Sequence, residues 1–94
     1  MPKFIIERDI PEIGSADQAA LSAAAGQSNS VLSAMQSEQK DIQWEHSYVA
    51  GDKTYCVYNC ASEDLIHEHA ERSGFPASNI IEVKNQIDPS TADA

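Results

Sequence analysis

The sequence predicts an α+β domain in which two helices and four strands follow one another in the order β-α-β-β-α-β. Two segments, residues 17–39 and 63–73, repeat their less polar side chains at steps of three and four residues, as helices do. Residues 41–50 instead alternate mainly aromatic or apolar side chains with mainly polar ones, which is typical of a strand. A short turn then leads into another strand-like segment, residues 53–61, and the two segments are predicted to form a hairpin.

The N-terminal part of the chain predicts one strand and one long helix. Residues 3–10 (KFIIERDI) are rich in Phe and Ile and are interpreted as the first strand. Ser15 and Gln18 have the spacing of a capping box, so the helix is expected to start there and to continue to about Gln39. Gly26 lies in mid-helix, where it predicts either a kink or a close approach of the small-residue first half to the sheet.

The predicted hairpin carries the tryptophan, the three tyrosines and both cysteines of the chain. Cys56 and Cys60 lie four residues apart in one strand, or roughly 13 Å, whereas a disulfide needs Cα atoms within about 7 Å. Both cysteines are therefore expected to be free and to point to the same face, as small buried residues in a reducing compartment. The alternation in the other strand assigns one face to four side chains: Ile42, Trp44, His46 and Tyr48.

The C-terminal part predicts a second helix, a last strand and a polar tail. Ser62 is suited to cap the helix, which is expected to end at about Ser73 because Gly74 suits the left-handed position that follows helices. Residues 78–87 are interpreted as the fourth strand and residues 88–94 as the tail. With short connections and right-handed crossovers, this order gives a ferredoxin-like fold, in which a four-stranded antiparallel sheet carries both helices on one face.

Length and charge limit the classes of function. The 94 residues suffice for one domain, residues 1–94, and are too few for two cores. Fifteen acidic residues against six basic ones give a formal net charge of −9, which would repel nucleic acid and anionic membrane surfaces. No membrane span or signal peptide is visible, so the expected location is the cytoplasm. The sheet face without helices must be covered, and apolar side chains there favour a homodimer of packed sheets.

Three side chains are candidates for metal or acid–base chemistry: Glu7, His46 and His69. The helical stripe of residues 63–73 directs His69 toward the sheet and His67 outward. If the face that carries His46 meets the helices, its imidazole converges with that of His69, while the alternation leaves open on which face Glu7 lies. Two imidazoles and a carboxylate suit Zn, Ni, Cu or Fe, and they would equally serve proton transfer to a small molecule.

Several segments together resemble the small bacterial nickel-binding-protein family. They are MPKFIIERDIP at residues 1–11, WEHSYV at 44–49, DKTYCVY at 52–58, EHAERSGFP at 68–76 and IDPSTA at 87–92. The resemblance implies a ferredoxin-like fold, a homodimer and binding of nickel or a similar divalent ion. At the level of the fold alone, the chain also resembles the dimeric α+β barrels, which include cofactor-free monooxygenases and small isomerases.

Three functions are compatible with these residues. The first is a metal-binding protein for sequestration or sensing, with Glu7, His46 and His69 as ligands. The second is an enzyme with a pocket between sheet and helices, in which His46 or His69 is the general base. The third is an interaction module in which the histidines are structural. In the first two, four aromatic side chains are candidates for contacting a ligand: Trp44, Tyr48, Tyr55 and Tyr58.

Overall fold

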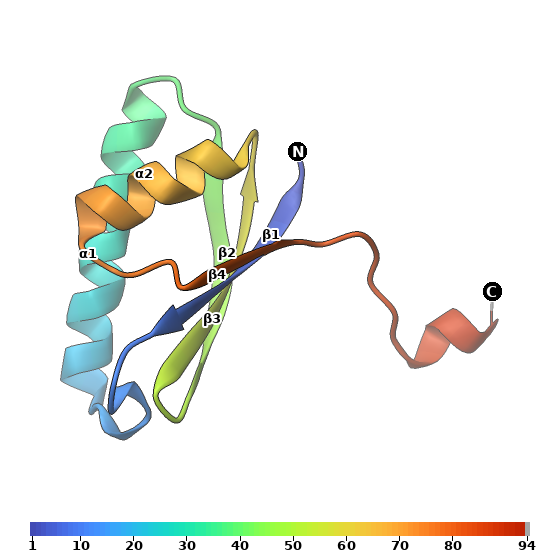
Figure 1. Ribbon diagram of the computed structural model, residues 1–94, viewed down its shortest axis with the longest axis horizontal. Helices are drawn as coiled ribbons and strands as arrows, with labels where there is room; N and C mark the ends of the chain where they lie inside the picture. The colour runs from blue at the N-terminus through green and yellow to red at the C-terminus, as the bar shows by residue number, and fades with distance from the viewer. Residues whose placement is uncertain (94) are drawn as a thin grey trace.

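Figure 1 shows the computed structural model, which describes residues 1–93, as a four-stranded sheet with two helices on one face. Ala94, at the end of the expected polar tail, lies outside the described residues. All strand pairs are antiparallel and the strand order is β2-β3-β1-β4, which confirms the predicted fold class. The elements in chain order are β1 (Lys3–Asp9), η1 (Ile13–Ser15), α1 (Gln18–Ser37), β2 (Ile42–Ala50), β3 (Lys53–Cys60), α2 (Glu63–Ser73), β4 (Asn79–Glu82) and η2 (Pro89–Asp93).

Helix α1 begins later than the capping-box pattern predicts. Ser15 belongs to the short 3₁₀ turn η1, and its hydroxyl donates a hydrogen bond to the carbonyl of Glu12. Asp17 caps the helix instead, because its carboxylate accepts a hydrogen bond of 2.8 Å from the backbone N–H of Ala20. The helix then runs unbroken through Gly26, so the expected kink is not found.

A β-bulge in β2 overturns the predicted faces of that strand. Trp44 pairs with Tyr58, but His46 already pairs with Val57, so Glu45 is an extra residue without a partner on β3. One extra residue reverses the alternation of the side chains that follow it. Trp44 therefore lies on the helix side of the sheet, whereas His46 and Tyr48 lie on the opposite side, and the prediction of one common face is wrong.

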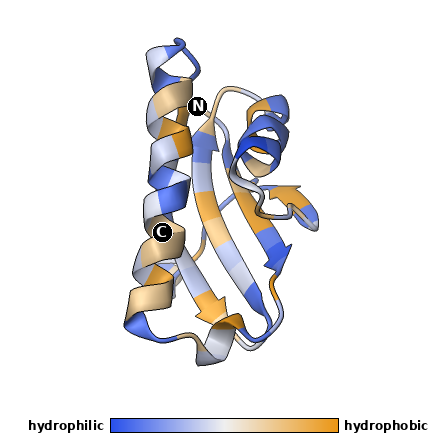
Figure 2. Cartoon of the chain, turned by 90° about the vertical axis from the view of Figure 1, so that its left-hand side faces the viewer, coloured by the Kyte–Doolittle hydropathy of each residue, from blue (hydrophilic) through white to orange (hydrophobic). Residues whose placement is uncertain are grey.

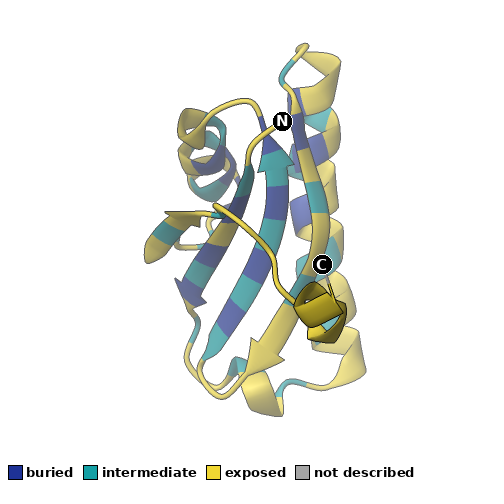
Figure 3. Ribbon diagram, turned by 90° about the vertical axis from the view of Figure 1, so that its right-hand side faces the viewer, coloured by how far each residue is buried: buried dark blue, intermediate teal, exposed yellow. Residues whose placement is uncertain are grey.

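The core lies between the sheet and the two helices (Figure 2). Alternate side chains of β1 and β3 point into it, and both cysteines are free and buried there, as predicted. No helix described for residues 1–93 packs on the opposite face, which we call the outer face; the C-terminal segment with η2 passes in front of it in Figure 3 but leads away from the sheet in Figure 1. The main buried apolar residues of the core are Phe4, Ile6, Leu32, Met35, Ile42, Cys56, Tyr58, Cys60 and Ile66.

Strand β4 is shorter than predicted. It pairs with β1 only over Asn79–Glu82, and one further hydrogen bond of 2.8 Å joins the N–H of Val83 to the carbonyl of Lys3. Beyond this point the chain runs past the first residue of β1, so residues 84–87 have no neighbouring strand to pair with. Helix α2 matches its prediction, with Ser62 at the N-cap and Gly74 in the left-handed conformation at φ 80°.

Among residues 1–93, no helix has the length and apolar character needed to cross a lipid bilayer.

Candidate functional site

Four polar side chains from four different elements meet in the core. His69 of α2 is fully buried, and its Nε2 lies 3.1 Å from the hydroxyl of Ser28 on α1. The same hydroxyl lies 3.4 Å from that of Tyr58 on β3, and the Tyr58 ring contacts the imidazole at a centroid distance of 5.5 Å. Arg8 of β1 completes the group, which we call the inner cluster: Arg8, Ser28, Tyr58 and His69.

Arg8 fixes the tautomer of His69. Its Nη2 lies 3.5 Å from Nδ1 of His69, and a guanidinium only donates hydrogen bonds. Nδ1 must therefore accept, so the ring proton sits on Nε2 and is donated to Ser28. Burial, and then the positive charge of Arg8, lower the pKa of His69 to about 4, so the imidazole is neutral at neutral pH.

Arg8 was missed by the sequence reasoning, although the pattern contains a signal for it. It is the third inward position of β1 after Phe4 and Ile6, and it is only 3% exposed. Its Nη1 donates hydrogen bonds to the carbonyls of Phe75, at 3.4 Å, and Pro76, at 2.9 Å. No carboxylate among residues 1–93 forms an ion pair with it, which is uncommon for a buried charge.

The outer face carries Glu7 and His46, the other two candidate metal ligands that the sequence predicts. Glu7 pairs across the strands with Tyr55, which in turn pairs with Tyr48, so these three side chains form one row. His46 begins the neighbouring row, which continues with the apolar side chains Val57, Ile5 and Ile81. Tyr48 is 64% exposed and Ile81 is 51% exposed.

Lysine side chains neutralise the acids of the outer face. Lys53 Nζ lies 2.6 Å from Glu7 Oε1 and 3.1 Å from Asp9 Oδ1. The hydrogen bond from Lys53 holds the pKa of Glu7 below its ordinary value, so Glu7 is ionised at neutral pH. Lys3 forms a similar pair with Glu45, the bulge residue, at 3.1 Å.

The three predicted ligands do not meet in one chain. Glu7 and His46 share the outer face, with β3 between their strands and roughly 10 Å between the two backbones. His69 lies in the opposite layer, so the expectation that it converges with His46 is wrong, and the bulge at Glu45 is the reason. Across the described residues 1–93, no group of three or more His, Cys, Asp or Glu side chains is placed to hold a metal ion.

Comparison with known proteins gives the family. A family model described as "Nickel responsive protein SCO4226-like" matches residues 4–83. The chain belongs to this SCO4226-like family. The crystal structure of SCO4226 from Streptomyces coelicolor A3(2) matches with a TM-score of 0.70 at 18% identity, over 90% of this chain and 99% of that one, so the two share a fold. No curated protein matches the chain.

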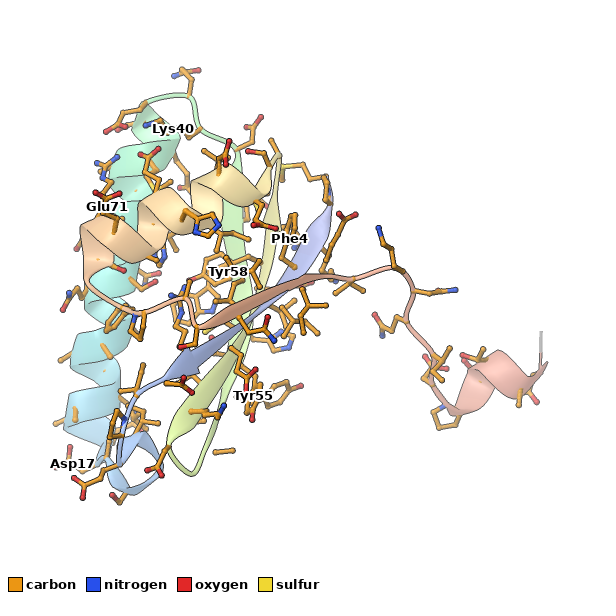
Figure 4. The ribbon with its side chains drawn as sticks, viewed as in Figure 1. Phe4, Asp17, Lys40, Tyr55, Tyr58 and Glu71 are labelled. Atoms are coloured by element: carbon orange, nitrogen blue, oxygen red, sulfur yellow. The ribbon has the colours of Figure 1, made fainter. Side chains whose placement is uncertain are left out.

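The aromatic side chains of this SCO4226-like chain divide between the two faces. Tyr58 and Tyr55, both labelled in Figure 4, lie on opposite faces of β3. Tyr48 lies beside Tyr55, with its ring edge-on to His46 at a centroid distance of 5.2 Å. Trp44 lies on the inner side, where it stacks with Tyr58 at 6.5 Å. The four predicted ligand contacts therefore do not form one pocket.

A cavity of about 240 Å³ lies on the inner side, between α1 and the sheet. Arg8, Ser28, Trp44 and Tyr58 contribute to its walls, whereas neither His46 nor His69 does. A histidine general base in direct contact with a ligand in this space is therefore not supported. His69 is joined to the cavity wall indirectly, through its hydrogen bonds with Ser28 and Arg8.

Proposed function

We propose that this SCO4226-like protein binds nickel or a similar divalent transition metal, for sequestration or sensing, at a site that two copies of the chain complete together. The single observation that carries the proposal is the position of His46 and Glu7 on an uncovered sheet face, beside the exposed apolar side chains Ile5 and Ile81. The family description, which names a response to nickel, supports the choice of metal.

The outer face has the composition of an interface between two copies. Its middle rows hold Ile5, Val57, Ile81 and the two tyrosines, and an apolar surface of this kind is typical of a contact site. Charged side chains such as Lys3 and Lys53 lie toward its ends, as they do at the rim of an interface. A two-fold axis through this face would pack sheet against sheet and bury these side chains in both copies.

The donor groups of the outer face suit nickel. Imidazole nitrogen is a preferred ligand of Ni, Cu and Zn, and a carboxylate is an acceptable second ligand. One chain offers His46 with Glu7, Asp9 or Glu45 on this face, and no three of the described side chains are close enough together to hold a metal ion. Two copies double the number of donors, and the net charge of −9 favours the approach of a cation.

Calorimetric titration of chelator-stripped protein with Ni²⁺ tests the proposal. We expect binding at a simple ratio of metal to chain, weakened at least about tenfold in His46→Ala because one imidazole ligand is lost. His67→Ala is the matched control, since His67 lies exposed on α2 beside Glu63 and away from the outer face. Equal losses in both variants, or none in His46→Ala, would contradict the proposed site.

A further inference from the structure

We propose that the cavity between α1 and the sheet binds a small organic carboxylate, with its carboxylate on Arg8 and its apolar body against Trp44. This inference is independent of the metal proposal, because the two sites lie on opposite faces of the sheet. Three properties of the cavity support it: an unpaired buried cation, apolar walls of suitable size, and hydroxyl groups beside the cation.

The buried guanidinium of Arg8 supplies the charge that such a ligand needs. Two main-chain carbonyls and Nδ1 of His69 accept hydrogen bonds from it, but these partners carry no negative charge. The Tyr58 ring lies beneath it, with the guanidinium carbon 5.9 Å from the ring centroid. A buried cation without a counter-ion is unfavourable, and a carboxylate is the group that fits the planar donor fork of arginine.

The cavity exists because the residues on both of its walls are small. Ala24, Ala25 and Ser28 of α1 face Ser47, Thr54 and Cys56 of the sheet. The small-residue half of α1, for which a close approach to the sheet was one expectation, thus leaves a hollow beside it. Larger apolar side chains complete the lining, among them Ile10, Leu21 and Phe75.

The size and lining of the cavity set the class of ligand. Benzene fills an apolar cavity of about 150 Å³ in another protein, so about 240 Å³ accommodates one ring or a short alkyl chain with a carboxylate attached. Apart from Arg8, the polar side chains of the wall are four hydroxyls, the Cys56 thiol and the Trp44 indole N–H, so a cationic ligand would meet only the positive charge of Arg8. Val49, at the edge of the cavity on β2, is 42% exposed and leaves a route for entry.

Ser28 and Tyr58 place hydroxyl donors beside Arg8. The Ser28 hydroxyl accepts a hydrogen bond from Nε2–H of His69, so it can itself donate a hydrogen bond to Tyr58 or to a ligand. Both residues line the cavity. A carboxylate, which only accepts hydrogen bonds, matches this set of donors better than an alcohol or an amine does.

Fluorescence of Trp44 gives a direct readout, because it is the single tryptophan of the chain and lines the cavity. We would titrate the full chain with benzoate, phenylacetate and hexanoate, and with benzamide and inorganic phosphate for comparison. At least one carboxylate should bind at least about tenfold more tightly than benzamide, since only the carboxylate compensates Arg8. Equal affinity for benzamide, binding of phosphate alone, or no response to any carboxylate would overturn the proposal.

A pair of variants on α1 tests the location. Ala24→Leu fills the cavity and should abolish the response, whereas Ala23→Leu places the same side chain on the exposed side of the helix and should leave it unchanged. Arg8→Lys retains the charge without the fork and should weaken carboxylate binding by about tenfold. Should either cavity variant fail to fold, as circular dichroism would reveal, the comparison of carboxylate with benzamide in the unmodified protein still decides the question.

Discussion

Between the sheet and the helices, His69 is hydrogen-bonded to both Arg8 and Ser28, whereas on the outer face His46 and Tyr48 are open to solvent. Both faces combine apolar and titratable side chains, so composition does not distinguish them. The difference lies in what covers them. Polar groups under the helices must satisfy one another within the chain, while those on the outer face remain available to a second copy or a metal.

The largest expected effect comes from a charge at the centre of the outer face. Ile81→Lys should convert the expected dimer to monomers, with the dissociation constant raised at least about 100-fold, because the interface would have to bury an unpaired ammonium group. Sedimentation measurements over a range of protein concentrations would check this. Ala23→Lys, on the exposed side of α1, is the control, and a wild-type protein that is itself monomeric would contradict the interface.

Removal of His69 should have the next largest effect, this time on folding. His69→Asn deletes a fully buried ring and leaves Arg8 or Ser28 without its partner, which should lower the free energy of unfolding by about 2–4 kcal/mol. Urea unfolding at fixed protein concentration measures the change. His67→Ala should change stability by less than about 0.5 kcal/mol, because its contact with Glu63 is exposed.

The pH dependence of stability separates the inner cluster from the surface ion pairs. The pKa of His69 is about 4 in the folded protein and 6.5 in the absence of the fold, so between these values only the unfolded chain binds the proton. The contribution of neutral His69 to stability is therefore complete above pH 6.5 and is lost as the pH falls from 6.5 to 4, at up to about 1.4 kcal/mol per pH unit.

The ion pairs act in a lower pH range. Arg72 lowers the pKa of Glu38 to about 2, so the stabilisation by that pair is complete above 4.5 and is lost as the pH falls toward 2. Urea unfolding at several pH values should therefore show a decline between pH 6.5 and 4 that is absent from His69→Asn. An equal decline in the variant would mean that His69 is not the group responsible.

The smallest expected effect concerns the lysine that neutralises the outer face. Nickel must compete with Lys53 for Glu7, so Lys53→Met should strengthen nickel binding about fivefold if Glu7 is a ligand. Lys84→Met, at an exposed lysine paired with Glu82, controls for the change in net charge. Identical affinities in the two variants would remove Glu7 from the site.

Most of the fold was predictable because local signals and topology rules agree. The second helix, with Ser62 before it and Gly74 after it, and the hairpin turn at Gly51 follow from residues whose conformational preferences are strong. The start of α1 was missed because Ser15 and Asp17 are both residue types that cap helices. Asp17 is the cap in the structure, and Ser15 belongs to the preceding turn η1. Strand β4 was overestimated because its length depends on where β1 begins, which is a tertiary property.

The candidate site was predictable only in part. That His69 points inward follows from helical spacing alone, and the structure places it there. The face of His46 depends on the extra residue Glu45, and an alternating pattern read along one strand gives no sign of a bulge. The alternation of β1 places Arg8 on the same side as Phe4 and Ile6, so its inward position could have been predicted. An arginine near the end of a strand is, however, ordinarily expected to be exposed.

The histidine-ring NMR signals during a titration with Ni²⁺ test the central claim most directly, because the chain has three histidines in three different environments. We predict that the signals of His46, on the outer face, shift or broaden first, while those of buried His69 and of His67 on α2 stay in place. Perturbation centred on His69 would contradict the account, since it would put the metal inside the core rather than between two sheets.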